Sequence, residues 1–255
     1  MKNPIWEGIY NNFSEVNREG KGFSGELWVK NSCNKIEKIK QSTLNGDSSK
    51  ITGFRESILP VIAGMVMADQ GFVKILDFGG GMGFTFYPVY LSLPDKKKFE
   101  YHIVEVFNVC ESGKSFYEGI PEIKFHSVLP QGNFDIVNMG SSLQYIEDWK
   151  GMLNTLARYK SQYFLLSDLP AGNIPTYVTV QNYYDSKIPV WFFNVSEIID
   201  TLTDLNYQLI LKVPYISNIL GLEQPYPQEN LEKKYRIGYP LILLFKMKND
   251  FWKKF

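Results

Sequence analysis

Four glycines crowd a five-residue turn that directly follows a short apolar run. They are Gly79, Gly80, Gly81 and Gly83. Glycine lets an extended ligand approach the backbone closely, and a helix that follows such a turn offers free N–H groups and a positive dipole end. Asp77, near the end of the run 73–78, supplies a carboxylate that can accept hydrogen bonds from the turn's amides or from an amine of the ligand. These residue types predict a cofactor-binding turn.

The spacing of the glycines separates two classes of cofactor. Dinucleotide-binding turns follow the pattern G-x-G-x-x-G/A, in which the third small residue allows close packing of helix against strand. Counting from Gly79 places Phe84 at that third position, where its ring would obstruct the packing. The pattern that remains is G-x-G-x-G over residues 79–83, which disfavours a nicotinamide dinucleotide.

A second acidic residue stands where a ribose-binding group is expected. Glu105 ends the apolar run 100–105 and lies 22 residues after Gly83 (105 − 83 = 22). This is close to the interval at which an acid binds the cofactor ribose in related sheets, and one carboxylate can accept bonds from both ribose hydroxyls. The alternative is an ordinary glycine turn with an exposed glutamate. The turn, its strand and the placed acid together favour cofactor binding.

These residues need a sheet to position them, and the surrounding sequence predicts one. Runs typical of strands cover residues 73–78, 100–105, 123–126, 134–139 and 163–167. Helical patterns separate most of these runs, as at 84–91 and 149–159, which indicates parallel strands joined by helices. The last third adds a helix over 196–205 and strands over 207–213 and 241–247. We therefore expect an α/β fold with a Rossmann-like, mostly parallel seven-stranded sheet and helices on both faces.

The regions outside these runs predict two parts of the chain. Residues 1–50 show no sustained periodicity and are interpreted as an irregular N-terminal arm, while residues 51–255 form the Rossmann-like domain. The domain opens with a helix from Ile51 to Gly71 that Pro60 should kink or divide. The long segment 214–239 is expected to cover the site or to pack along the sheet edge.

Composition excludes several classes of function. Lysine and arginine balance aspartate and glutamate at 27 each, so the net charge is zero and a nucleic-acid partner is not expected. Cys33 and Cys110 lie far apart without metal-ligand spacing, which predicts reduced thiols and no metal site. The longest apolar run near the end, 241–245, is too short to span a membrane, and no apolar signal opens the chain. These features predict a cytoplasmic protein; they do not indicate an oligomeric state.

The glycine turn resembles motif I of class I S-adenosylmethionine-dependent methyltransferases, whose cofactor has no pyrophosphate to seat. Residues 134–146 look like the fourth-strand region of these enzymes. Together with the turn and residues 6–10 and 191–193, they are similar to a family of methyltransferases from bacterial surface-polysaccharide gene clusters. The resemblance implies that Ser127, after the third strand, and Gly140, after the fourth, also border S-adenosylmethionine. It further implies a small-molecule or saccharide acceptor.

Methyl transfer from a sulfonium is an in-line displacement, so the protein must mainly align the donor and the nucleophile. A hydroxyl acceptor would benefit from a general base beyond the carboxyl ends of the fourth and fifth strands. Tyr145 and Asp168 occupy such positions and are the catalytic candidates. Alternatively, Asp168 caps the following turn and Tyr145 only packs. Residues 181, 183 and 184 (Gln, Tyr, Tyr) could line an acceptor pocket or a half-buried loop.

The sequence thus predicts a methyltransferase that uses S-adenosylmethionine and acts on a small molecule or a sugar of surface-polysaccharide biosynthesis. An alternative is a protein that binds S-adenosylmethionine without transferring its methyl group, as a scaffold or sensor. The donor site is more clearly marked than the acceptor site, and this difference keeps the alternative open. A nicotinamide-dependent enzyme is a third hypothesis, which Phe84 disfavours.

Overall fold

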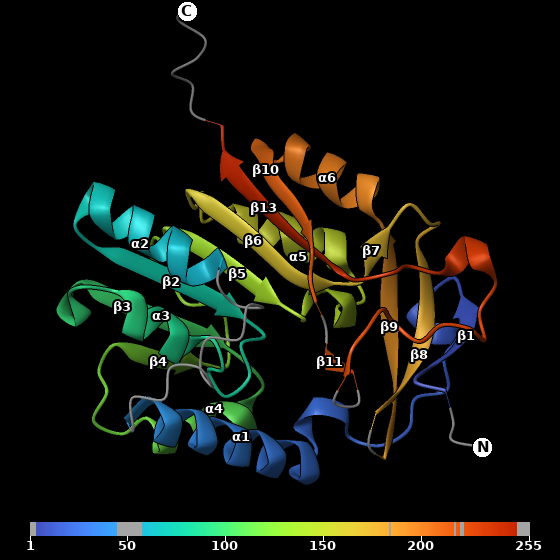
Figure 1. Ribbon diagram of the computed structural model, residues 1–255, viewed down its shortest axis with the longest axis horizontal. Coiled ribbons are helices and arrows are strands. Elements are labelled where there is room, and N and C mark those ends of the chain that lie inside the picture. The colour runs from blue at the N-terminus through green and yellow to red at the C-terminus, as the bar shows by residue number, and fades with distance from the viewer. Residues whose placement is uncertain (1–3, 45–57, 184, 217, 220–221, 249–255) are drawn as a thin grey trace, which may run out of the picture.

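A seven-stranded sheet runs through the centre of the protein (Figure 1). The computed structural model describes residues 4–44, 58–183, 185–216, 218–219 and 222–248. The strands are β2 (Val73–Phe78), β3 (Phe99–Val104), β4 (Ile123–His126), β5 (Ile136–Gly140), β6 (Tyr163–Leu169), β10 (Tyr207–Pro214) and β13 (Leu241–Met247). Their order is β10-β13-β6-β5-β2-β3-β4, and only β13 runs antiparallel to its neighbours. The predicted mostly parallel sheet of seven strands is confirmed.

Six helices pack on this sheet in the described part of the chain. They are α1 (Glu26–Leu44), α2 (Ile58–Gln70), α3 (Phe86–Ser92), α4 (Phe107–Phe116), α5 (Trp149–Ala157) and α6 (Val195–Asp204). Side chains alternate across a strand, so Ile75 joins the core under α1 to α4 whereas its neighbour Leu76 joins the core under α5 and α6. Helices therefore cover both faces, as the sequence predicts.

The helix α2 contains Pro60 without being divided by it. Pro60 lies in the first turn, where the missing N–H has no helical partner to lose and the fixed φ suits the helix. The described helix is therefore not divided at Pro60 and runs unbroken to Gln70. Residues 51–57, where the predicted helix would begin, lie outside the described residues.

The N-terminal region is not irregular, and this prediction is wrong. It contains β1 (Trp6–Tyr10) and the 19-residue helix α1. Ile36 of α1 is fully buried in the core, and Trp28, Val29 and Ile39 pack against the same cluster. The proposed boundary at residue 50 lies outside the described residues.

A second, smaller sheet joins segments from distant parts of the sequence. Its order is β1-β8-β9-β7, with β7 (Ala171–Gly172), β8 (Tyr177–Tyr183) and β9 (Ser186–Asn194). A two-stranded ribbon, β11 (Asn218–Ile219) with β12 (Leu222–Glu223), lies between β10 and β13 in the sequence. Figure 1 shows the smaller sheet beyond the C-terminal ends of β2 and β5. It therefore adds a wall at the edge where parallel sheets bind ligands.

None of the described helices is both long enough and apolar enough to cross a membrane.

The two histidines of the chain form a pair across neighbouring strands. Nδ1 of His102 lies 3.0 Å from Nε2 of His126, and Nε2 of His102 lies 2.8 Å from Oε2 of Glu100. His102 is buried, and this burial lowers its pKa to about 4. The ring is therefore neutral in the folded protein near pH 7.

We expect this pair to make stability pH-dependent. Unfolded His102 has a pKa near 6.5, so the unfolded state binds the extra proton as pH falls below that value, and stability is lost toward pH 4. Between pH 7 and pH 5 the loss should be about 2 kcal/mol. Urea unfolding at both pH values measures it, and His102→Gln should show a smaller pH dependence. An equal dependence in both proteins would show that His102 ionises normally.

Candidate functional site

The glycine turn adopts backbone conformations that other residues avoid. Gly79, Gly81 and Gly83 have φ angles of +72°, +57° and +77°. These lie in the left-handed region, where a Cβ atom is disfavoured. The N–H of Gly79 donates to the carbonyl oxygen of Val104 at 2.9 Å, which fixes the turn against the end of β3.

Close neighbours leave no room for side chains in the first half of the turn. A Cβ atom at Gly79 would lie 2.4 Å from Cβ of Ser142, and one at Gly80 would lie 2.4 Å from Oδ2 of Asp77. Ser142 is held in place because its hydroxyl donates to the carbonyl of Phe78 at 2.8 Å. The turn therefore presents backbone without side chains, which allows an extended ligand to approach it closely.

Asp77 lies next to the turn and is held by three side-chain hydrogen bonds. It is buried, and its Oδ2 accepts hydrogen bonds from the hydroxyls of Tyr101 at 2.6 Å and Thr85 at 3.0 Å. Its Oδ1 accepts from the side-chain amide of Asn138 at 2.7 Å. Burial raises the pKa of the Asp77 carboxyl, and these three bonds oppose the rise. The sequence predicts that Asp77 accepts hydrogen bonds from amides of the turn or from an amine of the ligand. In the structure its hydrogen-bond partners are side chains of the sheet and of Thr85.

Glu105 lies beside the turn at the end of β3. Its carboxylate accepts from the N–H of Gly81 at 3.1 Å and from the N–H of Val106 at 2.8 Å. Burial raises the pKa of this carboxyl. The structure thus places Glu105 and the predicted cofactor turn in direct contact.

Two apolar residues that sequence reasoning missed flank this acid. Val106 follows Glu105, and Val128 follows Ser127 at the end of the neighbouring strand β4; they are 45% and 73% exposed. Exposed valines beside an acid that is predicted to bind a ligand could offer apolar contacts to a flat ring. The signal was present in the sequence, since each valine comes directly after a candidate binding residue.

Replacing Glu105 tests its predicted role. We expect Glu105→Ala to weaken binding of S-adenosylhomocysteine by about 1 to 3 kcal/mol, because the ribose hydroxyls lose a charged acceptor. Isothermal titration calorimetry measures the change. Glu111→Ala, which removes an exposed acid from α4, serves as the control and should bind normally. Unchanged affinity in folded Glu105→Ala would assign the ribose to another residue.

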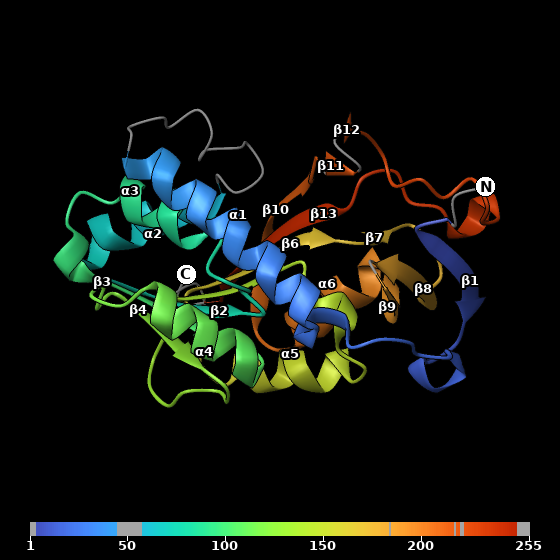
Figure 2. The same ribbon diagram turned by 90° about the horizontal axis from the view of Figure 1, so that it is seen from below.

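The helix α1 and the residue that follows the turn both lie close to Gly81. Cη2 of Trp28 lies 3.7 Å from the position of a Cβ at Gly81, and Cε2 of Phe84 lies 3.0 Å from it. The ring of Phe84 also carries the ammonium of Lys35 at 4.2 Å from its centre. Figure 2 shows α1 passing between α3 and α4, both of which it contacts. The ring of Phe84 thus occupies the space beside the turn, as its place in the pattern predicts.

The ends of β5 and β6 hold a second group of polar residues. Ser141 directly follows β5 and Asp168 is the penultimate residue of β6, and their φ angles are +54° and +49°. Non-glycine residues seldom adopt this conformation, and such strain concentrates at functional sites. The N–H of Ser141 donates to the carbonyl of Ser167 at 2.8 Å, so the two strained residues lie at adjacent strand ends.

Asp168 accepts hydrogen bonds from residues in two distant parts of the chain. Its Oδ1 accepts from the hydroxyl of Tyr226 at 3.3 Å. The side-chain amide of Gln144 donates to the Asp168 carbonyl at 3.4 Å and to the Ser141 hydroxyl at 3.1 Å. Gln144 is 3% exposed, and its amide oxygen has no hydrogen-bond partner among the described residues. Gln144 and Tyr226 were not identified from the sequence.

Tyr145 belongs to the same group. Its hydroxyl donates to the side-chain oxygen of Gln181 at 2.9 Å. Burial, together with the nearby charge of Asp168, raises the pKa of Tyr145 above its usual value. Tyr145 therefore stays protonated near pH 7 and acts as a hydrogen-bond donor.

The predicted site residues thus converge on the carboxyl edge of the main sheet. Gly140 ends β5 between the glycine turn and Asp168, and Ser127 follows β4 beside Glu105. Of the three residues suggested for an acceptor pocket, Gln181 contacts Tyr145, and Tyr183 lines a neighbouring cleft. Residue 184 lies outside the described residues. The roles of these residues remain predictions.

Comparison with known proteins places this architecture in a class. The fold is similar to that of 1,6-didemethyltoxoflavin-N1-methyltransferase from Burkholderia thailandensis, with a TM-score of 0.53 and 11% identity over 94% of this chain and 100% of that one. It is also similar to an S-adenosylmethionine-dependent methyltransferase from Clostridium acetobutylicum ATCC 824, with a TM-score of 0.50 and 12% identity over 85% and 99% of the two chains.

The chain therefore has the Rossmann-like fold of class I methyltransferases. The sequence itself matches no family model and no curated protein.

Proposed function

We propose that the protein is an S-adenosylmethionine-dependent methyltransferase that acts on a small molecule. The proposal rests on the carboxyl edge of the main sheet. This edge holds a glycine turn with an adjacent acid, and it also holds an aspartate with a left-handed backbone inside a polar cluster. A methyltransferase needs these two half-sites side by side, one for the donor and one for the acceptor. The fold supports the same activity.

The residues present fit S-adenosylmethionine. The turn 79–83 would receive the extended amino-acid part, where no side chain can stand, and Glu105 would accept bonds from the ribose hydroxyls. Val106 and Val128 offer apolar contacts to the adenine ring, with Ser127 and Gly140 bordering the same edge. When bound, this cofactor supplies a methyl group on a sulfonium: the acceptor's lone pair bonds to the methyl carbon while the C–S electrons return to sulfur.

The polar cluster supports the acceptor half of the reaction. Asp168 would accept the proton that a hydroxyl or amine acceptor loses as its new bond to carbon forms. The hydroxyl of Tyr226 holds one oxygen of this carboxylate, and the hydroxyl of Tyr145 can orient the acceptor. A protein that only bound the cofactor would need no such strained base, so this cluster favours the enzyme over the scaffold or sensor.

The chemical class of the small-molecule acceptor is a prediction. The resemblance in the sequence implies a sugar of surface-polysaccharide biosynthesis, and a cytoplasmic location is expected with it. The similar Burkholderia protein is an N1-methyltransferase bound to 1,6-didemethyltoxoflavin, which is a different kind of small molecule. Hydroxyl and nitrogen nucleophiles are both compatible with a carboxylate base.

Calorimetry with three ligands tests the proposal. We expect S-adenosylmethionine and S-adenosylhomocysteine to bind and NAD not to bind, because Phe84 occupies the place of the third small residue of a dinucleotide turn. Tight NAD binding without a response to either adenosyl compound would refute the methyltransferase. A mass-spectrometric screen with S-adenosylmethionine and mixed acceptors then tests turnover. Cofactor binding with no methylated product from any acceptor would favour the scaffold or sensor.

A further inference from the structure

A cleft of about 370 Å³ opens beside the proposed acceptor half-site. One wall is residues 20–28 of the N-terminal segment, and the other is the end of the β8–β9 hairpin. The lining residues are Gly20, Lys21, Gly22, Gly25, Glu26, Leu27, Trp28, Tyr183, Asp185 and Ser186. This volume lies within the range of small-molecule sites.

Hydrogen bonds hold the two walls together. The N–H of Gly22 donates to the hydroxyl of Ser186 at 3.1 Å. Next to it, Glu19 and Lys187 exchange backbone hydrogen bonds of 2.9 and 3.3 Å, and their side chains form an ion pair at 2.8 Å. The cleft is therefore a formed feature of the fold and not a gap between unconnected loops.

Phe23 contacts aromatic rings of both this cleft and the proposed transfer site. Its ring centre lies 5.6 Å from that of Trp28 and 5.9 Å from that of Tyr183, both of which line the cleft. The ring of Tyr145, from the cluster around Asp168, lies 4.6 Å from that of Phe23. A molecule in the cleft is thus one aromatic ring away from the residues proposed to act on the acceptor.

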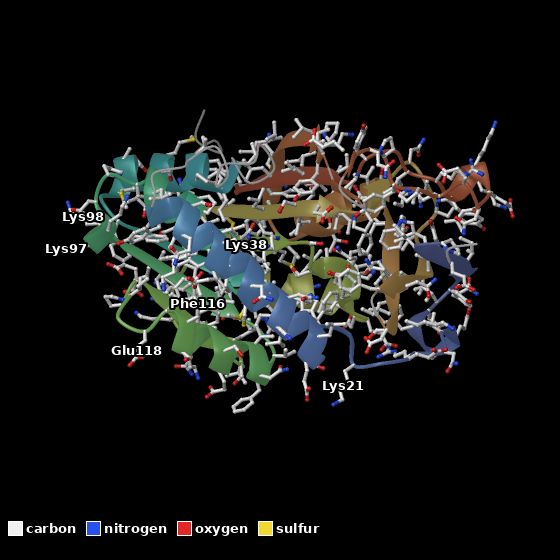
Figure 3. The ribbon with its side chains drawn as sticks, turned by 60° about the horizontal axis from the view of Figure 1, so that its bottom comes forward. Lys21, Lys38, Lys97, Lys98, Phe116 and Glu118 are labelled. Carbon is white, nitrogen blue, oxygen red and sulfur yellow. The ribbon has the colours of Figure 1, made fainter. Side chains whose placement is uncertain are left out.

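The charged residues that line the cleft are mostly acidic. Glu26 and Asp185 come from opposite walls of the cleft. Lys21 is the one basic residue in the described lining, and in Figure 3 its side chain extends away from the body of the protein. Within the described lining, a phosphate or carboxylate would meet two carboxylates and a single lysine that extends outward, whereas an amine or an uncharged ring would not be repelled.

We propose that this cleft is the outer part of the acceptor site and that it takes an uncharged or cationic molecule with a ring. The ring would lie against Trp28 and Tyr183, and Glu26 and Asp185 select against anions. The inference rests on the proposed methyltransferase function. It narrows the acceptor to molecules without phosphate, which excludes sugar nucleotides and leaves free sugars, amines and neutral heterocycles.

Three matched phenols test the charge selection. Tyramine is a cation near pH 7, 4-hydroxyphenethyl alcohol is neutral and 4-hydroxyphenylacetate is an anion, while ring and linker are shared. Their affinities are measured by ligand-observed NMR on protein saturated with S-adenosylhomocysteine. We expect tyramine and the alcohol to bind, and the acetate to bind about tenfold more weakly than tyramine. Equal affinity for the acetate and tyramine, or no binding of any probe, would overturn the inference.

A double variant tests the location. Glu26→Gln with Asp185→Asn should reduce the preference for tyramine over the acetate about fivefold, because both carboxylates of the cleft are lost. Glu111→Gln with Glu118→Gln removes the same charge from exposed positions on and after α4 and should leave the preference unchanged. An unchanged preference in the cleft variant would place the probes elsewhere. Failure of S-adenosylhomocysteine to bind, measured first, would count against the methyltransferase and not against this selection.

Discussion

Asp168→Asn is expected to slow single-turnover methyl transfer by roughly 10² to 10⁴-fold while S-adenosylhomocysteine binds normally. The amide cannot take the acceptor's proton, so the acid limb of the pH–rate profile should disappear with the base. Asparagine is a suitable replacement because it tolerates the left-handed backbone of this position, where φ is +49°. The variant therefore changes the chemistry without adding backbone strain.

The same substitution discriminates between catalysis and capping. Asparagine also caps turns, so a purely structural Asp168 predicts nearly normal rates. Asp200→Asn, at an exposed position of α6, is the control and should leave the rate unchanged. Near-normal turnover in Asp168→Asn would remove this residue from the proposed mechanism and leave the cluster without a base.

Gly79→Ala is expected to lower affinity for S-adenosylhomocysteine by more than about 100-fold, which is roughly 3 kcal/mol. The new methyl group would stand 2.4 Å from Cβ of Ser142, whose hydroxyl is bonded to the Phe78 carbonyl. Relief of this overlap must move the turn, and the turn is the proposed seat of the cofactor. Calorimetry on the folded variant measures the loss.

A second glycine separates the overlap from backbone strain. Gly71 has a φ of +75°, close to the +72° of Gly79, but a Cβ there would meet no atom within 4 Å. Gly71→Ala therefore carries the same left-handed penalty, about 1 to 2 kcal/mol of stability, without touching the turn. It should bind S-adenosylhomocysteine normally. Equal affinity losses in both variants would attribute the effect to general destabilisation.

The main sheet was predictable because its signals are local. Each strand is a short apolar run bounded by turn residues, and the predicted run 73–78 coincides with β2. The predicted cofactor turn and Glu105 come directly after such strands, so the parallel pairing of β2 and β3 brings them together. Asp168 and Tyr145 could be placed at neighbouring strand ends for the same reason.

The helix α1 was missed although its periodicity is present. Val29, Cys33 and Ile36 recur at spacings of four and three, which is the pattern of one buried helical face. Many lysines and asparagines dilute this face, so the segment as a whole has the composition of a loop. The structure shows that this narrow apolar face packs against the core, and that this packing is sufficient for the segment to form a helix.

The acceptor side was less predictable because its contacts are not local. Gln181 and Tyr226 reach Tyr145 and Asp168 across 36 and 58 positions of the sequence. No periodicity within one segment carries information about such pairings. The left-handed conformation of Asp168 is one that aspartate tolerates better than most residues, but the residue type alone does not show which aspartate adopts it.

The pairing of β1 with β8 bears on how the chain folds as it is synthesised. Trp6 pairs with Gln181, 175 positions later (181 − 6 = 175), and its ring stacks on that of Tyr226 at 5.1 Å. During synthesis β1 must therefore wait, unpaired, until the residues of β8 have been added. Closing so long a loop carries an entropic cost and slows folding. The parallel core can form earlier, so the wall of the acceptor side is completed last, and an unpaired β1 edge remains open to aggregation during translation.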